Sequence, residues 1–273
     1  MEMQFIYADN AATTKMSDVA VKAMLPYLQE TYANASSVHI LGQRSAAALF
    51  SARQQLAQLL HCAPKELFFT SGGSEADNQA LISAAAIGKQ QGKRHIISTA
   101  MEHHAILHTL EALEEQGFTV TLLRPQKDGI VSAAQVAAAL TDETCLVSVM
   151  YANNETGAIQ PIKEIGALCR QHGVLFHTDA VQAAGHVDID VQRDNIDMLS
   201  LSAHKFHGPK GVGLLFAKSS IQLTSLIRGG GQERGKRAGT ENLPGIVGLA
   251  AAFKDAQEQL AVNTAYITNL RDA

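Results

Sequence analysis

The chain has 273 residues, of which 46% are hydrophobic and 18% charged, and its formal net charge is −4. This composition allows a sizeable buried core, and it lacks the basic excess that nucleic-acid partners and anionic membrane surfaces favour. The three cysteines, Cys62, Cys145 and Cys169, are odd in number and far apart. This usage indicates reduced thiols in a cytoplasmic protein rather than a disulfide framework or a zinc site.

The N-terminal stretch, residues 1–10, carries acidic side chains and no apolar segment of the kind found in signal peptides. The longest apolar runs are far shorter than the ~20 residues that a membrane-spanning helix needs. We therefore expect no signal peptide, and neither a membrane nor a nucleic acid as partner.

Short apolar segments alternate with longer helical patterns along most of the chain. The predicted strands cover residues 66–70, 95–99, 119–123, 145–150, 174–178 and 198–202. The predicted helices cover residues 43–60, 75–89, 105–116, 133–140 and 162–171, and a last helix, open to interruption, covers 246–270. Gly117 and Gly173 stand where two of these helices would end. The alternation predicts a layered α/β domain with a mainly parallel sheet.

A lysine, Lys205, lies just after the apolar strand 198–202 and before a Gly-Pro turn. Partial desolvation there lowers the pKa of an amine and frees it for covalent chemistry with an aldehyde. The alternative for an isolated lysine is an ordinary surface loop.

An acidic residue, Asp179, stands at the end of the apolar strand 174–178. A buried carboxylate there is costly unless it has a partner. A protonated ring nitrogen, such as that of pyridoxal phosphate, would be one such partner. A helix N-cap is the alternative.

A Gly-Gly turn follows strand 66–70 and leads into a helix, within the segment Leu-Phe-Phe-Thr-Ser-Gly-Gly-Ser-Glu-Ala-Asp-Asn of residues 67–78. Backbone N–H groups at that helix start, together with the Ser74 hydroxyl, form a candidate phosphate cradle. An ordinary capped helix, with Ser71 or Ser74 as the cap, is the alternative.

Two further polar segments follow strands, residues 98–105 with His103 and residues 150–157 with Asn154. A histidine at a strand end can stack on an aromatic ring and move protons near neutral pH. His104 and His108 have the i,i+4 spacing of metal ligands, but no further ligand completes such a site. Because all five polar segments follow apolar strands, they would converge on one edge of a parallel sheet.

These five segments, in this order, resemble the cysteine desulfurases of the class V aminotransferase group, which are fold type I enzymes dependent on pyridoxal 5′-phosphate. Residues 7–14 and the segment Gly-Gly-Gly-Gln-Glu-Arg-Gly-Lys-Arg-Ala-Gly-Thr-Glu-Asn of residues 229–242 resemble that family as well. The later segment is similar to the branch that serves iron–sulfur cluster assembly and tRNA thiolation.

The resemblance implies a three-layer large domain over residues 16–250, preceded by a segment, residues 1–15, that contributes to the active site or to a small domain. Residues 251–273 would begin a helix leading into a C-terminal domain that is largely missing. Enzymes of this family are longer than this chain, and both their nucleophilic cysteine and their arginine for the substrate carboxylate would lie beyond Ala273. Little or no activity is therefore expected of the 273 residues alone.

The resemblance also implies roles for individual residues. Lys205 would hold the cofactor covalently, Asp179 would pair with its ring nitrogen, and His103 would stack on the ring and move protons. The remaining cofactor contacts would come from Gly73, Ser74, Asn154, Gln182, Ser202, His204 and, across a homodimer, Thr240.

The implied reaction takes sulfur from L-cysteine and leaves L-alanine and a protein persulfide, which an iron–sulfur scaffold or another sulfur-acceptor protein would receive. Alternatives on the same scaffold are a selenocysteine lyase or another class V aminotransferase. A truncated, inactive cofactor-binding module is a third possibility. A Rossmann-type nucleotide binder fits the alternation of elements but lacks the G-x-G-x-x-G turn.

Overall fold

The computed structural model describes residues 6–273. Residues 1–5, which belong to the expected N-terminal segment and to the stretch that bears on a signal peptide, lie outside the described residues. Within residues 6–273, no helix combines the length and apolar character that a membrane crossing requires.

Seven strands form one sheet in the order β1–β7–β6–β5–β4–β2–β3. Their bounds are β1 Leu67–Thr70, β2 His95–Thr99, β3 Thr119–Leu123, β4 Thr144–Ser148, β5 Leu175–Asp179, β6 Met198–Ser202 and β7 Gly213–Ala217. β7 runs antiparallel to its neighbours β1 and β6, whereas the other pairs are parallel. Six strands therefore end at the same edge of the sheet.

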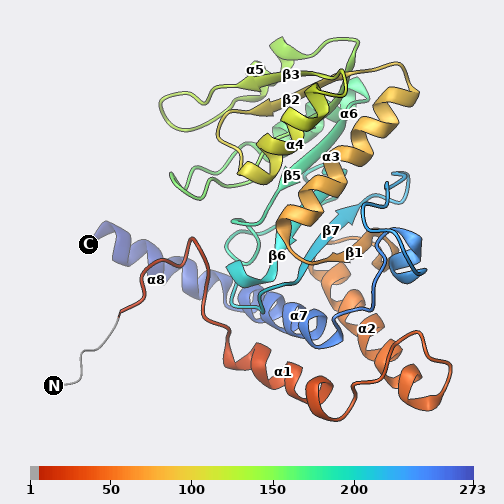
Figure 1. The fold of residues 1–273 in the computed structure, drawn as a ribbon. Coiled ribbons are helices and arrows are strands. Elements are labelled where there is room, and N and C mark those ends of the chain that lie inside the picture. The colour runs from red at the N-terminus through yellow and green to blue at the C-terminus, as the bar shows by residue number, and fades with distance from the viewer. Residues whose placement is uncertain (1–5) are drawn as a thin grey trace.

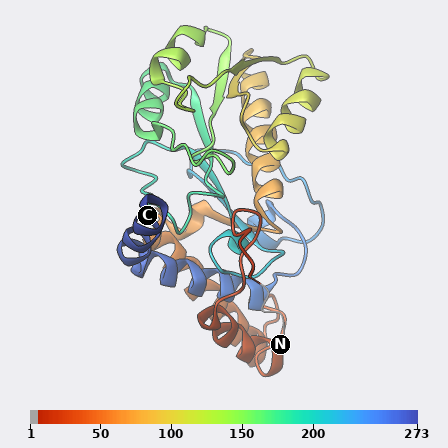
Figure 2. The same ribbon diagram turned by 90° about the vertical axis from the view of Figure 1, so that its left-hand side faces the viewer.

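Helices cover both faces of this sheet (Figures 1 and 2). Their bounds are α1 Asp18–Gln29, α2 Ile40–Leu59, α3 Gly73–Gln90, α4 His104–Glu114, α5 Ala133–Ala139, α6 Ile162–His172, α7 Leu243–Glu258 and α8 Leu260–Asp272. One apolar cluster joins a sheet face to α3 and α4 through residues such as Ala80 and Leu110. The other joins the opposite face to α2, α6 and α7 through Leu56, Ile165 and Leu249. The mainly parallel, three-layer α/β fold is thus confirmed.

The strands alternate their side chains between these two clusters. In β1, Phe68 belongs to the cluster with α3, whereas Phe69 belongs to the cluster with α2. Because both faces of the central strands are covered, mainly apolar segments suit them, whereas the edge strand β3 is partly exposed and contains two threonines.

All six predicted strands are present, with ends that shift by at most two residues. The additional strand β7 was not predicted, because a parallel strand order calls for a helical connection whereas β7 follows β6 through a short one. The helix α1 was also not predicted.

Helix ends depart from the predictions in two places. The long helix expected over 246–270 starts earlier and breaks at Gln259, between α7 and α8. Gly173 caps α6 in the left-handed conformation, as predicted, but the C-cap of α4 is Glu115 rather than Gly117. Since α7 runs across residue 250, the expected domain boundary there stays a prediction.

Candidate active site

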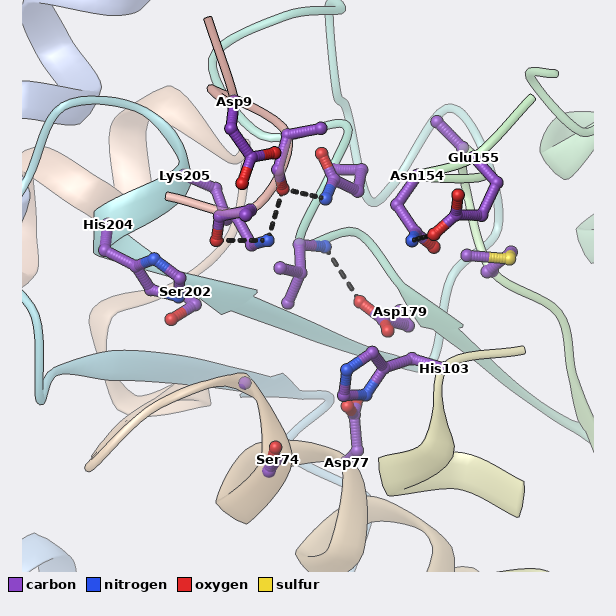
Figure 3. A pocket seen from close by; sticks show the side chains of 17 residues that line it. Asp9, Ser74, Asp77, His103, Asn154, Glu155, Asp179, Ser202, His204 and Lys205 are labelled. Carbon is purple, nitrogen blue, oxygen red and sulfur yellow. Dashed lines mark hydrogen bonds between the residues drawn. The ribbon is translucent and has the colours of Figure 1, made fainter. Parts of the chain in front are cut away.

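A cavity of about 440 Å³ opens at the edge where the parallel strands end (Figure 3). The loops after β1, β2, β4, β5 and β6 all contribute to its wall, as does the N-terminal segment around Asp9. Of the predicted site residues, it brings together Gly73, Ser74, His103, Asn154, Asp179, Gln182, Ser202, His204 and Lys205.

Lys205 ends a short 3₁₀ turn, Ala203–Lys205, that directly follows β6. Its Nζ donates hydrogen bonds to the backbone oxygens of Ala11, at 2.5 Å, and Ala12, at 2.9 Å. Partial burial lowers the pKa of Lys205, while the carboxylates of Asp179 and Asp9 oppose this shift. The amine is thus held inside the cavity by two backbone oxygens.

Asp179 is the last residue of β5 and is only 5% exposed. Its Oδ1 accepts a hydrogen bond of 2.8 Å from the backbone N–H of Val181. Burial raises the pKa of the Asp179 carboxyl, whereas the Val181 N–H, His103 and Lys205 favour its ionised form. A cationic ring nitrogen in the cavity would complete the set of partners that a buried carboxylate requires.

His103 forms the N-cap of α4, since its Nδ1 accepts a hydrogen bond of 3.1 Å from the N–H of Ala105. The cap fixes the tautomer, because an accepting Nδ1 leaves the proton on Nε2. The imidazole lies at the same end of the cavity as Asp179 (Figure 3).

The start of α3 is open toward the cavity. Gly72 occupies the N-cap position, and within the described residues no side chain caps this end of the helix. A hollow beside it, of about 400 Å³, is lined in part by Ser74, Ser202, His204 and Lys210. Free backbone N–H groups at the start of an 18-residue helix, hydroxyls and a cationic side chain suit a phosphate group.

Three further predicted residues are held by the protein itself. Gln182 Nε2 donates to the Ala11 oxygen at 2.9 Å, and Asn154 Nδ2 donates to Oε1 of Glu155 at 2.8 Å. His204 Nδ1 lies 3.0 Å from the Thr13 hydroxyl. Hence contacts between the N-terminal segment and the loops after β5 and β6 hold two of these side chains in the cavity wall.

Thr240 is the predicted residue that the structure does not bring to this cavity. It is exposed in the segment 229–242, which packs on the outer side of β1. Its expected role in the cofactor site of a partner subunit stays a prediction.

Sequence reasoning missed Asp77 as part of the cavity wall, and it gave residues 1–15 a place in the active site or a small domain without naming the contact of residues 11–12 with Lys205. Asp77 lies three residues after Ser74 on α3, a spacing that places both on one helix face, so this signal was available. The contacts of residues 11–12 with Lys205 depend on a chain reversal that no local pattern predicts.

The fold and this cavity define an α/β protein with a basic amine, a buried carboxylate and an open helix N-terminus at the carboxyl edge of its sheet. The family model described as "Aminotransferase class-V" matches residues 6–271. The chain therefore belongs to the class V aminotransferase family.

Relatives within this family are similar over almost the whole chain. "Cysteine desulfurase IscS" of Clostridium botulinum is 52% identical over 266 residues, which cover 97% of this chain and 67% of that protein. The solved structure titled "NIFS-LIKE PROTEIN" matches with a TM-score of 0.96 and 38% identity, over 98% of this chain and 74% of that chain. "SspA in complex with cysteine" matches with a TM-score of 0.88 and 42% identity, over 92% and 72% of the two chains.

Proposed function

We propose that this chain is the cofactor-binding part of a cysteine desulfurase that uses pyridoxal 5′-phosphate to remove sulfur from L-cysteine. The observation that carries the proposal is the placement of Lys205 and Asp179 in one cavity, beside an open helix N-terminus. The curated relatives named as cysteine desulfurases and the SspA structure with cysteine support this substrate.

The residues fit the cofactor. The amine of Lys205 would bind its aldehyde carbon, and Asp179 would hold the proton on its ring nitrogen. Gly73, Ser74, Ser202 and His204 would surround its phosphate, since they line the wall at the start of α3. When bound, the cofactor supplies an electron sink for the charge that develops at the substrate Cα.

The remaining side chains would act on the substrate and on protons. His103 would stack on the ring, and its tautomer suits the transfer of a proton at Nε2. Gln182 and Asn154, whose amide groups donate to neighbouring oxygens, would move to contact the ring oxygen and the amino acid.

A thiol to receive the sulfur is not found in this cavity among residues 6–273. Burial raises the pKa of Cys62 and Cys169 to about 12 and that of Cys145 to about 11, so none is a thiolate at neutral pH. The chain spans about two thirds of the curated relatives' length. The persulfide-forming cysteine would therefore come from outside the described residues.

The test is the fate of L-cysteine on the cofactor-loaded chain. We expect L-cysteine to change the visible absorbance of the bound cofactor, with the cofactor recovered unchanged and little or no sulfide released. Sustained release of sulfide and alanine would contradict the inference that no suitable thiol is present. Accumulation of the amine form of the cofactor and of a 2-oxo acid would indicate an aminotransferase instead.

A homodimer, a sulfur-acceptor or iron–sulfur scaffold partner and a cytoplasmic location complete the proposal. The three free cysteines support a reducing compartment. Exposed Thr240 is available to a second subunit, as the family resemblance implies.

Substitution of Gly73 by alanine tests the phosphate cradle. A Cβ at position 73 would lie 2.6 Å from Cγ2 of Val181, whose N–H holds Asp179. The clash would displace Val181 and the start of α3 from the positions that the cofactor requires, and a loss of ~1.4 kcal/mol in binding is tenfold in affinity. We expect the dissociation constant of the cofactor to rise about tenfold, measured by absorbance titration.

The matched control is Gly231→Ala, because a Cβ at Gly231 meets no atom within 4 Å and the backbone there has a negative φ. We expect this variant to bind the cofactor like the parent chain. Equal affinity of the Gly73 variant and the parent would remove this glycine from the cradle.

A further inference from the structure

A second carboxyl group, that of Asp77, lies in the wall of the cavity beside Asp179 and is only 1% exposed. Its Oδ1 is buried and has no hydrogen-bond partner among the described residues. Figure 3 shows it on α3, below the ring of His103. No role follows for this residue from the sequence.

The basic side chain in contact with Asp77 is that of His177, whose Nε2 lies 3.7 Å from Oδ1. That distance is too long for a hydrogen bond, and Nε2 is already 3.1 Å from the Ser200 hydroxyl. Complete burial lowers the pKa of His177 to about 3, so the ring is neutral and offers Asp77 no charge.

The other titratable groups around Asp77 are acids. Asp179 and Glu102 both raise the pKa of Asp77, which burial already places well above its usual range. Glu102 is itself buried, with Oε2 unpartnered and its pKa raised to about 8. Burial raises the pKa of Asp179 as well, but Asp179 differs from both because the Val181 N–H, His103 and Lys205 favour its charged form. Three neighbouring carboxyl groups that are buried from water do not all ionise. The hydrogen-bond donors and charges around each carboxyl decide which one is ionised.

We propose that Asp77 is a positioning residue that stays protonated at neutral pH, so that Asp179 is the single anion facing the ring nitrogen of the cofactor. This inference rests on the proposed function for the cofactor, but the protonation of Asp77 belongs to the protein alone. The Asp77 carboxyl lines the cavity and lies beside the neutral ring of His177, which contacts the Ser200 and Ser148 hydroxyls.

The first test compares the stability of the cofactor-free chain with that of Asp77→Asn, by denaturant unfolding between pH 5 and pH 8. A carboxyl that is protonated when folded but ionised when unfolded makes the folded state bind one more proton. Above the ordinary pKa of aspartate, about 4, the folding equilibrium constant then falls tenfold per pH unit. We expect the folding equilibrium constant of the parent, divided by that of the variant, to fall about tenfold for each unit that the pH rises. A ratio that does not change with pH would overturn the proposal.

The second test assigns the proton to one member of the pair. Asp77→Asn and Asp179→Asn each replace a carboxyl group by an amide of the same shape, but on the proposal only Asp179→Asn removes a negative charge. We expect Asp77→Asn to bind the cofactor with an affinity within about threefold of the parent, and Asp179→Asn to bind it about tenfold or more weakly. Equal losses in both variants would show that Asp77 is charged and would overturn the proposal.

The two proposals fail in different ways. If the parent chain binds no pyridoxal 5′-phosphate, the proposed function fails, but the pH dependence of unfolding still reports the protonation of Asp77. If the parent binds the cofactor and the unfolding ratio is flat, only the role of Asp77 is lost.

Discussion

The Lys205→Ala variant is expected to lose the visible absorbance band of the lysine-bound cofactor completely, together with any response to L-cysteine. Lys205 is the lysine that lines the cavity among residues 6–273, and partial burial lowers the pKa of its amine. A neutral amine is the form that condenses with an aldehyde. Absorbance spectroscopy of the chain after incubation with pyridoxal 5′-phosphate and desalting measures the loss directly.

Two controls separate this chemistry from structural damage. Lys205→Arg keeps a cation that can donate to the Ala11 and Ala12 oxygens, but a guanidinium does not condense with an aldehyde, so the band should still be absent. Lys163→Ala changes an exposed lysine on α6, and its spectrum should equal that of the parent. A band that persists in Lys205→Ala would remove this residue from its role and, with it, the proposed function.

The Glu233→Ala variant is expected to cause the largest loss of stability. Glu233 is 6% exposed, and its carboxylate accepts hydrogen bonds from both terminal nitrogens of Arg53 and from the N–H of Phe69. Removing one partner of a buried ion pair leaves the other charge buried without compensation, which typically costs ~3–5 kcal/mol. Thermal unfolding should show a fall in Tm of about 10 °C or more.

The expected loss has a local counterpart. Glu233 and Arg234 both adopt the left-handed conformation, with φ of 46° and 57°. The contacts of Glu233 stabilise this strained turn of segment 229–242, and Arg237 of the same segment pairs with Glu75 in the first turn of α3. Loss of Glu233 should therefore also weaken cofactor binding at the start of α3.

Two comparisons control for the Glu233 result. Asp188→Ala breaks an exposed pair with Arg193 and should cost less than ~1 kcal/mol. The double variant Arg53→Leu, Glu233→Leu removes both buried charges and should recover much of the lost stability. If Glu233→Ala and the double variant were both as stable as the parent chain, the ion pair would not hold segment 229–242 in place.

The patterns of the sequence were sufficient for six of the seven strands, and the family resemblance added most of the site residues. Each of the five polar segments follows a strand and lies at the same sheet edge, as the parallel order requires. Nine of the ten predicted site residues line the cavity for this reason, while Thr240 lies outside it. β7 is also an apolar segment, but its antiparallel pairing with β1 and β6 departs from the strand–helix alternation on which the predictions relied.

By itself, the sequence determined the layered α/β fold and the identity of the lysine, the aspartate and the glycine-rich turn, because these depend on short-range order along the chain. Only the tertiary structure decided that residues 11–12 hold the Lys205 amine, that Arg53 meets Glu233, and that Asp77 and Asp179 share a cavity. Burial and charge proximity set the protonation of each carboxyl, and both arise from contacts between residues far apart in the sequence.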